Sequence, residues 1–380
     1  MSAPPIRVLH VVGGMNRGGV ETWLMHVLRN RDPHRLRLDF LANTDQPSAY
    51  DDEIRDRGGR IFTCPGPHRL WKYARAFRRL LAEHGPFDVL HSHVHHFSGA
   101  LIRLARSAGV PIRVAHGHTD TRSEDAGAGL LRRGYLGLMR RLLSHHATHR
   151  LAASREAAHA LFGMEAPENS WQTFYCGVDL TPFRQGPDRA GVRAELGFAE
   201  DAFIVGHVGR FVEVKNHKFL LDVLAEVSLR EPRARMLLVG DGPLRAEIEG
   251  RAGRLGLAGR VRFLGARPDV PRLMGAMDVF VLPSRFEGLP LVGMEVQAAD
   301  VPLVLSDTIT SELDVVPGLI DRLSLSDPAA TWAEHALALG RRVRSITRAD
   351  AWARLESSPF NILHGVEALT SLYEKGLKRG

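Results

Sequence analysis

Short apolar runs alternate with amphipathic stretches along most of this chain. The runs predict buried strands and the stretches predict helices, an alternation typical of parallel βαβ units. The series occurs twice. The first series of predicted strands comprises residues 6–12, 36–41, 89–91, 113–116 and 150–153 and ends near 173–175. The second series comprises residues 203–208, 236–239, 261–264, 279–282 and 303–306.

The two series predict an α/β protein with two Rossmann-like, doubly wound domains that face each other across a cleft. We expect a first domain at residues 1–183, a second at 184–356 and a closing helical segment at 357–380. The linker at 181–191 is a candidate hinge. Ligands of such sheets bind beyond the carboxyl ends of the strands, so we expect the chemistry there.

Composition limits the ligands that the protein could bind and the cellular compartment in which it could reside. Lys and Arg total 50 against 43 Asp and Glu, and the net charge of +7 suits anionic ligands or an anionic membrane surface but is too small to indicate nucleic acid. The two cysteines, Cys64 and Cys176, form no disulfide framework or zinc ribbon and favour a reducing cytoplasm. We expect neither a signal peptide nor a membrane-spanning segment.

Two glutamates, Glu287 and Glu295, flank a predicted strand-to-helix turn. Residues 279–282 form the predicted strand, and Pro290 suits the first position of the helix that follows. Backbone N–H groups at the helix start could hold a diphosphate, while the two carboxylates receive sugar hydroxyls on either side. The combination indicates a sugar nucleotide, although Glu295 alone could be an acidic residue that only favours the helix dipole.

Two cations follow the first strand of the second series. Gly209 and Arg210 come directly after that strand, and Lys215 and Asn216 lie on the same turn. A guanidinium fork and an ammonium group could hold one diphosphate. Two solvated surface cations would give the same pattern, and both interpretations stay open.

Glycines mark two further turns after predicted strands. The turn that contains Gly240 and Gly242 permits a close approach to a ligand, but an ordinary strand-to-helix turn would look alike. The strand at 6–12 leads into a glycine-rich loop, where backbone could approach a phosphate, with glycines at Gly13, Gly14, Gly18 and Gly19. This loop lacks the G-x-G-x-x-G spacing, which disfavours an NAD enzyme.

Several of the nineteen histidines follow predicted strands, namely His91, His93, His95, His96, His116 and His118. Their spacing could supply zinc ligands, but no HExxH pattern or carboxylate cluster accompanies them, and we expect no metal. Hydrogen bonds within the fold, or to hydroxyls and phosphates, are favoured instead. His118 is the main candidate for such a contact, with a satisfied core histidine as the alternative.

In these pieces the chain resembles the retaining glycosyltransferases of family 4, which have the GT-B fold, over nearly its whole length. The matching pieces are residues 13–21, 115–119, 175–179, 209–210 with 215–216, 239–243 and 287–290 with Glu295. Each piece alone is weak, but their order and spacing are specific. Residues 50–54, 91–95 and 306–310 are similar to the bacterial exopolysaccharide-biosynthesis members.

The resemblance implies transfer of a hexose from a nucleotide-sugar, usually a UDP-sugar, to a hydroxyl of a glycan or lipid-linked acceptor, without a metal or other cofactor. The first domain would bind the acceptor and the second the nucleotide-sugar, and the last helix would return to the first domain. Catalytic roles would fall on Arg210, Lys215, Glu287 and His118. Substrate-binding roles would fall on Gly13, Gly14, Gly18, Gly19, His93, His116, Gly209, Asn216, Gly240, Gly242, Leu289, Pro290, Leu291 and Glu295.

Two further questions stay open at the level of sequence. The basic amphipathic segment 130–143 could lie on the inner face of the cell membrane or simply cover the core. A GT-B sugar-nucleotide epimerase would bind the same donor and need no acceptor. A non-catalytic sugar-nucleotide-binding protein would bind the donor without turning it over.

Overall fold

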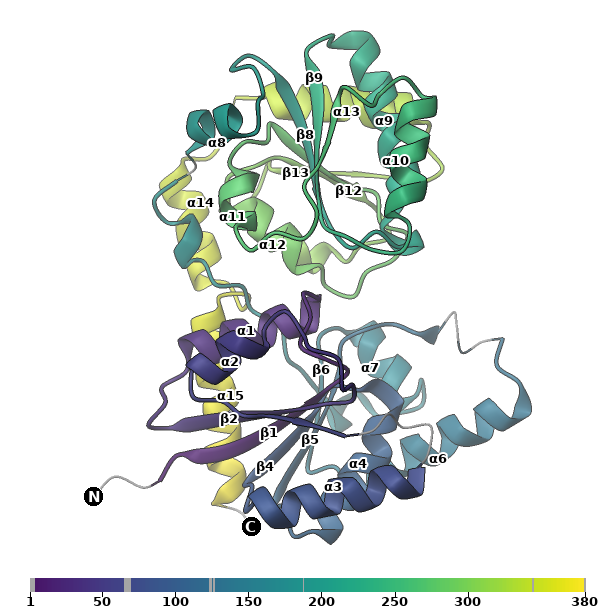
Figure 1. The fold of residues 1–380 in the computed structure, drawn as a ribbon, viewed down its shortest axis with the longest axis vertical. Helices are drawn as coiled ribbons and strands as arrows, with labels where there is room; N and C mark the ends of the chain where they lie inside the picture. The colour runs from purple at the N-terminus through teal and green to yellow at the C-terminus, as the bar shows by residue number, and fades with distance from the viewer. Residues whose placement is uncertain are drawn as a thin grey trace. The chain divides into compact units, whose positions relative to one another are not determined.

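The computed structural model describes residues 4–64, 70–122, 125, 127–186, 188–343 and 345–378. The chain forms two compact units, each built around one sheet with helices on both faces (Figure 1). The first unit comprises Met1–Gly177 and Ile362–Gly380, and the second comprises Val178–Asn361. The junctions therefore lie at 177/178 and 361/362, a few residues from the 183/184 and 356/357 expected from the sequence.

A seven-stranded parallel sheet forms the centre of the first unit. Its order is β3-β2-β1-β4-β5-β6-β7, so the direction of winding reverses between β1 and β4, where ligands of Rossmann-like sheets bind. The strands are β1 (Ile6–Val12), β2 (Leu36–Ala42), β3 (Ile61–Thr63), β4 (Val89–Ser92), β5 (Ile112–Gly117), β6 (His149–Ala152) and β7 (Gln172–Thr173).

Helices cover this sheet and close its core, in which Leu9, Phe77 and Leu90 are fully buried. The helices of the first unit are α1 (Gly19–Asn30), α2 (Asp51–Asp56), α3 (Leu70–His84), α4 (Ser98–Ser107), α6 (Leu130–His146), α7 (Arg155–Phe162) and α15 (Ile362–Leu377). Short 3-10 helices lie at η1 (His95–Phe97) and η2 (Glu168–Ser170).

The last helix, α15, belongs to the first unit and packs against α1. Its carboxylates Glu367 and Glu374 both contact the guanidinium of Arg35, which precedes β2. Apolar positions three or four residues apart give the helix one buried stripe, formed by Ile362, Val366, Leu369 and Tyr373.

The second unit contains a six-stranded parallel sheet in the order β10-β9-β8-β11-β12-β13. Its strands are β8 (Phe203–Val208), β9 (Ala234–Val239), β10 (Val261–Phe263), β11 (Val279–Leu282), β12 (Leu303–Ser306) and β13 (Ile320–Leu323). Its helices are α8 (Arg189–Glu195), α9 (His217–Arg230), α10 (Arg245–Arg254), α11 (Val270–Met274), α12 (Leu291–Ala298), α13 (Ala329–Arg341) and α14 (Arg348–Ser357). The 3-10 helices are η3 (Thr181–Phe183), η4 (Glu213–Lys215) and η5 (Ser311–Leu313).

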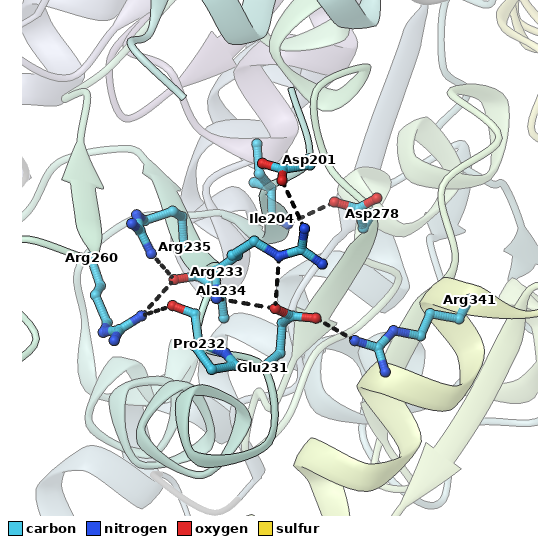
Figure 2. Close-up of polar contacts among 10 residues, drawn as sticks. All are labelled: Asp201, Ile204, Glu231, Pro232, Arg233, Ala234, Arg235, Arg260, Asp278 and Arg341. Carbon is cyan, nitrogen blue, oxygen red and sulfur yellow. Dashed lines mark hydrogen bonds and ion pairs between the residues drawn. The ribbon is translucent and has the colours of Figure 1, made fainter. Parts of the chain in front are cut away.

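A network of charged side chains joins helix ends to strand starts at the amino edge of this second sheet (Figure 2). Glu231, just after α9, accepts hydrogen bonds from Nη2 of Arg341 at 2.5 Å and from the backbone N–H of Arg233 at 3.0 Å. Asp278, just before β11, accepts from the backbone N–H of Ile204 in β8 at 2.7 Å. The network therefore lies at the edge opposite the loops in which the sequence places the chemistry.

Candidate functional site

Three loops at the carboxyl edge of the second sheet carry most of the predicted site: residues 209–216 after β8, 240–244 after β9 and 283–290 after β11. Backbone hydrogen bonds join the first two of these loops. The N–H of Phe211 donates to the carbonyl of Asp241 at 3.0 Å, and the carbonyl of Phe211 accepts from Leu244 at 3.1 Å. The sheet edge is therefore lined by a fixed backbone surface.

This close approach of the two loops explains two of the predicted glycines. A Cβ atom on Gly240 would lie 2.0 Å from the carbonyl oxygen of Gly209, and one on Gly242 would lie 2.6 Å from that of Phe211. Gly240 also has a φ of +136°, which residues with a side chain rarely adopt. Loop packing alone accounts for both glycines, and their contact with a ligand stays a prediction.

Lys215 and Glu287 lie in direct contact. The Nζ atom of Lys215 is 2.5 Å from Oε1 of Glu287, and both side chains are mostly buried. Beside them the N–H of Arg285 donates to the carbonyl of Val214 at 2.8 Å, which holds the loop after β11 against the loop after β8. The structure thus brings these two predicted residues together as an ion pair.

Arg210 lies on the same loop but is exposed. No hydrogen bond or ion pair reaches its guanidinium from the part of the chain that the structure describes. Asn216 follows Lys215 in the left-handed region, with a φ of +56°, and separates η4 from α9. Asn adopts this conformation more readily than most residues, so it suits the sharp turn that sets the direction of Lys215.

Glu295 lies one turn into α12, as the sequence predicts. The helix itself begins at Leu291 with Pro290 as its N-cap, so Pro290 stands one position earlier than expected, a shift within the usual uncertainty of helix ends. Burial raises the pKa of Glu295 to about 7. Within the described residues, no hydrogen bond or ion pair satisfies this carboxyl group.

The glycine-rich loop of the first unit leads from β1 into α1, with Gly18 as the N-cap. A Cβ atom on Gly13 or Gly19 would meet nothing within 4 Å, whereas one on Gly14 would lie 3.0 Å from the methyl group of Thr44. Packing within the protein therefore does not require glycine at positions 13 and 19. This open space is compatible with close approach of a ligand, which stays a prediction.

The first sheet carries a cluster of histidine side chains at the carboxyl ends of β1, β4 and β5, formed by His10, His91, His93, His116 and His118. His10, His91 and His116 are fully buried, whereas His93 and His118 are partly exposed. His118 is thus placed where a ligand can reach it. His116 is not, so a direct substrate contact by His116 would need the cluster to open.

One hydrogen-bonded chain crosses the cluster from inside to outside. Nδ1 of His10 lies 3.0 Å from Nε2 of His93, and Nδ1 of His93 lies 2.9 Å from Nε2 of His118. Nδ1 of His118 then faces Sγ of Cys176 at 3.5 Å. Burial lowers the pKa of His10 and of His118 to about 3, so these imidazoles are neutral at physiological pH.

A second chain begins on the last helix. The hydroxyl of Tyr373 lies 2.7 Å from Nδ1 of His91, and Nε2 of His91 lies 3.2 Å from Nδ1 of His116. His10 and Tyr373 were not among the site residues expected from the sequence. His10 could have been found because it is a polar residue within the apolar strand β1. Tyr373 has the spacing of the apolar stripe of α15, so the sequence gives no sign of its hydrogen bond.

Metal binding is the alternative use of these histidines. The ring nitrogens of His10, His91 and His93, and those of His93, His116 and His118, lie within 4.8 Å of one another. However, in each hydrogen-bonded pair one ring nitrogen carries the proton and the other directs its lone pair at that proton. An ion midway between His93 and His118 would lie about 1.5 Å from each nitrogen, short of the roughly 2.0 Å of a zinc–imidazole bond. The geometry favours the hydrogen-bonded interpretation.

Comparison with known proteins identifies the family. Residues 18–177 match the model of a glycosyl transferase 4-like domain, and residues 188–331 match that of the glycosyl transferases group 1. The chain is 40% identical to the putative glycosyltransferase EpsF of Bacillus subtilis (strain 168), over 98% of its own length and 97% of that protein. This chain belongs to the group 1 glycosyltransferases. The glycosyltransferase is also 25% identical to the capsular polysaccharide biosynthesis glycosyltransferase CapH of Staphylococcus aureus, over 97% of its length and 98% of CapH.

Solved structures confirm the predicted GT-B fold of the glycosyltransferase. Anabaena HepE, crystallised in complex with UDP-glucose, matches 97% of this chain with 100% of its own, at a TM-score of 0.77 and 20% identity. WaaG, a glycosyltransferase involved in lipopolysaccharide biosynthesis, matches 97% of this chain with 98% of its own, at a TM-score of 0.69 and 17% identity. At these identities the likeness shows the fold alone.

Proposed function

We propose that this glycosyltransferase moves a hexose from a UDP-sugar to a hydroxyl of a glycan or lipid-linked saccharide, with retention and without a metal ion, in the biosynthesis of exopolysaccharide or another cell-surface polysaccharide. The functions of CapH and of WaaG in polysaccharide and lipopolysaccharide biosynthesis, and the UDP-glucose bound by HepE, support this proposal. One observation carries it: four side chains suited to a nucleotide-sugar, Arg210, Lys215, Glu287 and Glu295, lie on loops and one helix start at the same sheet edge.

The donor-binding roles follow from charge and position. Arg210 and Lys215 would bind the diphosphate, together with the free backbone N–H groups where α12 begins, near Leu289 and Leu291. Glu295 would accept hydrogen bonds from the ribose hydroxyls. Glu287 would position the donor sugar while it holds Lys215 in place. Two cations and a helix start supply the charge stabilisation that a metal provides in other transferases.

The transfer step needs no nucleophile from the protein. The bond between the anomeric carbon and the diphosphate oxygen breaks, and the acceptor oxygen bonds to that carbon from the same face through an oxocarbenium-like state. The departing diphosphate takes the proton of the acceptor hydroxyl. Lys215 and Arg210 stabilise the leaving group most strongly as its negative charge develops. In the first unit, the glycine-rich loop, His93 and His118 would contact the acceptor or the donor sugar.

A lipid-linked acceptor would bring the protein to the inner face of the membrane. Within the described residues no helix has both the length and the hydrophobicity needed to cross a bilayer. Helix α6 instead exposes Leu130, Leu131 and Leu138 beside basic side chains, which suits peripheral contact with anionic lipid. The free, buried Cys64 and Cys176 fit a cytoplasmic location.

Calorimetric titration with UDP, GDP, ADP and NAD, in EDTA, tests the donor site first. We expect one nucleoside diphosphate, UDP, to bind the wild type and to bind Glu295→Ala at least about tenfold more weakly, since a buried acceptor for two hydroxyls is lost. UDP-sugars would then be screened for transfer with and without EDTA. Binding of NAD alone, or of no nucleotide, would contradict the proposal.

The same screen separates the two alternatives named above. An epimerase would convert the donor sugar in the absence of any acceptor, and a non-catalytic binding protein would leave the donor intact during long incubation. The proposed transferase would release UDP slowly by hydrolysis and faster when an acceptor extract is added. Membership of the glycosyltransferase family favours this last outcome.

A further inference from the structure

The buried hydroxyl of Tyr373 has no part in the mechanism above. Tyr373 lies on α15, is only 1% exposed and comes from a segment far along the chain from the sheet that it reaches. A buried hydroxyl is costly to leave unpaired, and this one lies 2.7 Å from Nδ1 of His91. His91 in turn contacts His116, so a helix at the end of the chain is connected to the histidine cluster.

The direction of these hydrogen bonds follows from Tyr373, whose hydroxyl hydrogen has no other acceptor in the described structure, so that Nδ1 of His91 accepts it. Nδ1 of His116 faces His91, and its other nitrogen, Nε2, has no partner of ordinary geometry in the described structure. Burial and the neighbouring imidazoles lower the pKa of His116, so its ring is neutral and carries its proton on one nitrogen only. A neutral His116 with its proton on Nε2 must accept at Nδ1.

This assignment also fixes the proton positions on His91 and on the hydroxyl of Tyr373. His91 then donates from Nε2, accepts at Nδ1 and receives the O–H of Tyr373. The reverse direction would leave the hydroxyl hydrogen of Tyr373 without an acceptor, in addition to the unpaired Nε2 of His116. The first direction is therefore favoured, because it pairs the buried tyrosine hydroxyl and leaves only Nε2 of His116 unpaired among these groups.

Ring packing connects the tautomer of His116 to the position of His118. The rings of His116 and His118 lie 4.0 Å apart between centroids, and the edge of Trp23 packs on His116 at 5.3 Å. A single tautomer of His116 holds its ring in one orientation, and that ring is the surface on which His118 lies. His118 is the partly exposed member of the pair.

We propose that Tyr373 is a positioning residue: it fixes the tautomers of His91 and His116 and thereby holds His118 in the orientation that sugar transfer requires. The inference rests on the proposed function, in which His118 contacts the sugar. It gives α15 a role in the reaction besides packing. It also predicts that loss of one oxygen atom on this helix alters turnover at the carboxyl edge of the first sheet.

Tyr373→Phe tests this role, and Tyr73→Phe is its matched control. The hydroxyl of Tyr73 is equally buried and donates to Oδ1 of Asn43 at 2.7 Å, but lies outside the histidine chain. We expect Tyr373→Phe to lower kcat about tenfold with the donor KM within about twofold, and Tyr73→Phe to leave kcat within about twofold. Equal kcat changes in the two variants would mean a merely structural hydroxyl and would overturn the proposal.

NMR of protein labelled with 15N-histidine decides the tautomers without any assay of transfer. We expect His91 and His116 to carry their protons on Nε2 in the wild type, and both signals to change in Tyr373→Phe but not in Tyr73→Phe. An Nδ1–H tautomer of His91 in the wild type would refute the relay. If the wild type transferred no sugar from any donor, the proposed function would fail while the NMR result still decided the tautomer assignment.

Discussion

At the scale of single residues, the raised pKa of Glu295 predicts that donor binding depends on pH if this carboxylate holds the ribose as proposed. Burial raises its pKa from 4.5 to about 7, so about half of the molecules are protonated there at pH 7. Ribose hydroxyls would donate to the ionised form, whose fraction rises from about 10% at pH 6 to about 90% at pH 8. We therefore expect the Kd of a UDP-sugar to be roughly ninefold lower at pH 8 than at pH 6.

Calorimetry with an intact UDP-sugar is the suitable measurement, because its diphosphate diester has no group that titrates in this range, unlike the terminal phosphate of UDP. Glu295→Gln is the control, since its amide does not ionise and should remove the pH dependence. A Kd that varied equally in wild type and variant would assign the titration to another group. Glu295 holds its proton more tightly in the folded protein than in the unfolded chain. Its contribution therefore lowers the free energy of unfolding as pH rises from 4.5 toward 7.

In the proposed mechanism, Lys215 stabilises the leaving group together with Arg210. Its ammonium lies 2.5 Å from Glu287, so Lys215→Ala removes a charge from the diphosphate and leaves that carboxylate unpaired. We expect kcat to fall about 100-fold, as on loss of other groups that stabilise developing charge. Steady-state assays of UDP release measure this change.

Lys218→Ala is the matched control for this prediction. Lys218 lies three residues further on, in α9, and its ammonium pairs with Glu247 at 2.8 Å and with Glu213 at 3.4 Å on the exposed surface. Its loss should change kcat by no more than about twofold, because exposed ion pairs contribute little. Normal turnover in both Lys215→Ala and Arg210→Ala would show that neither cation stabilises the leaving group.

At the scale of elements, Asp278 holds the amino edge of the second sheet together. It accepts from the N–H of Ile204 and from the guanidinium of Arg193, which is buried in α8 and contacts Asp278 at 2.6 Å (Figure 2 shows the contact with Ile204). Asp278→Ala would leave Arg193 without its carboxylate. We expect the free energy of unfolding of this unit to fall by about 3–5 kcal/mol.

Scanning calorimetry with and without UDP checks this prediction, because the ligand should raise the transition of the unit that binds it. Asp201→Ala is the control: its pair with Arg233 is exposed on both sides, and its loss should cost about 0–1 kcal/mol. The affinity of folded Asp278→Ala for UDP should be unchanged. A large loss of affinity would show that the two edges of the sheet are coupled.

Predictability from sequence follows the burial of each element. The central strands β1, β8, β11 and β12 were predicted with the bounds that the structure gives, because strands covered on both faces must be apolar throughout. The hydrophobic pattern did not predict β3 and β13, which lie at sheet edges. β3 has three residues and β13 is the half-buried Ile-Asp-Arg-Leu, so neither shows a continuous apolar run.

Some residues of the candidate site could also be predicted from the sequence and others could not. Glu287 and Glu295 were placeable because a strand end, a turn and a helix start determine their positions locally. The contact between Tyr373 and His91 joins residues that are distant in sequence, and no local pattern encodes it. The glycines at 240 and 242 were recognisable as turn residues, but the reason for them, a neighbouring backbone, became visible only in the fold.

At the scale of the whole molecule, apolar and basic side chains are exposed together on two helices of the first unit. Helix α3 exposes Leu70 and Trp71, helix α6 exposes Leu130 and Leu131, and both helices pack on α4 (Figure 1). The basic amphipathic pattern of residues 130–143 predicted the exposed set on α6, whereas no sequence pattern predicted the one on α3. With a net charge of +7, such a surface suits the anionic face of a membrane.

Cosedimentation with vesicles of anionic lipid tests this surface. Arg133→Glu with Arg141→Glu reverses two exposed charges on α6 and spares Arg132, which pairs with Asp125. Each basic residue near such a surface contributes about 1 kcal/mol, so we expect vesicle binding to weaken at least about tenfold. The wild type should also release from vesicles as salt increases, because screening acts on the same charges.

The matched control reverses two exposed arginines of the second unit, Arg254→Glu with Arg262→Glu. It changes the net charge by the same amount but leaves the α6 surface intact, so it should bind vesicles nearly as well as the wild type. Equal weakening by both pairs would mean that net charge alone governs adsorption. Unchanged binding in the α6 variant would leave the amphipathic helix as a cover of the core, and would favour a glycan acceptor in solution over a lipid-linked one.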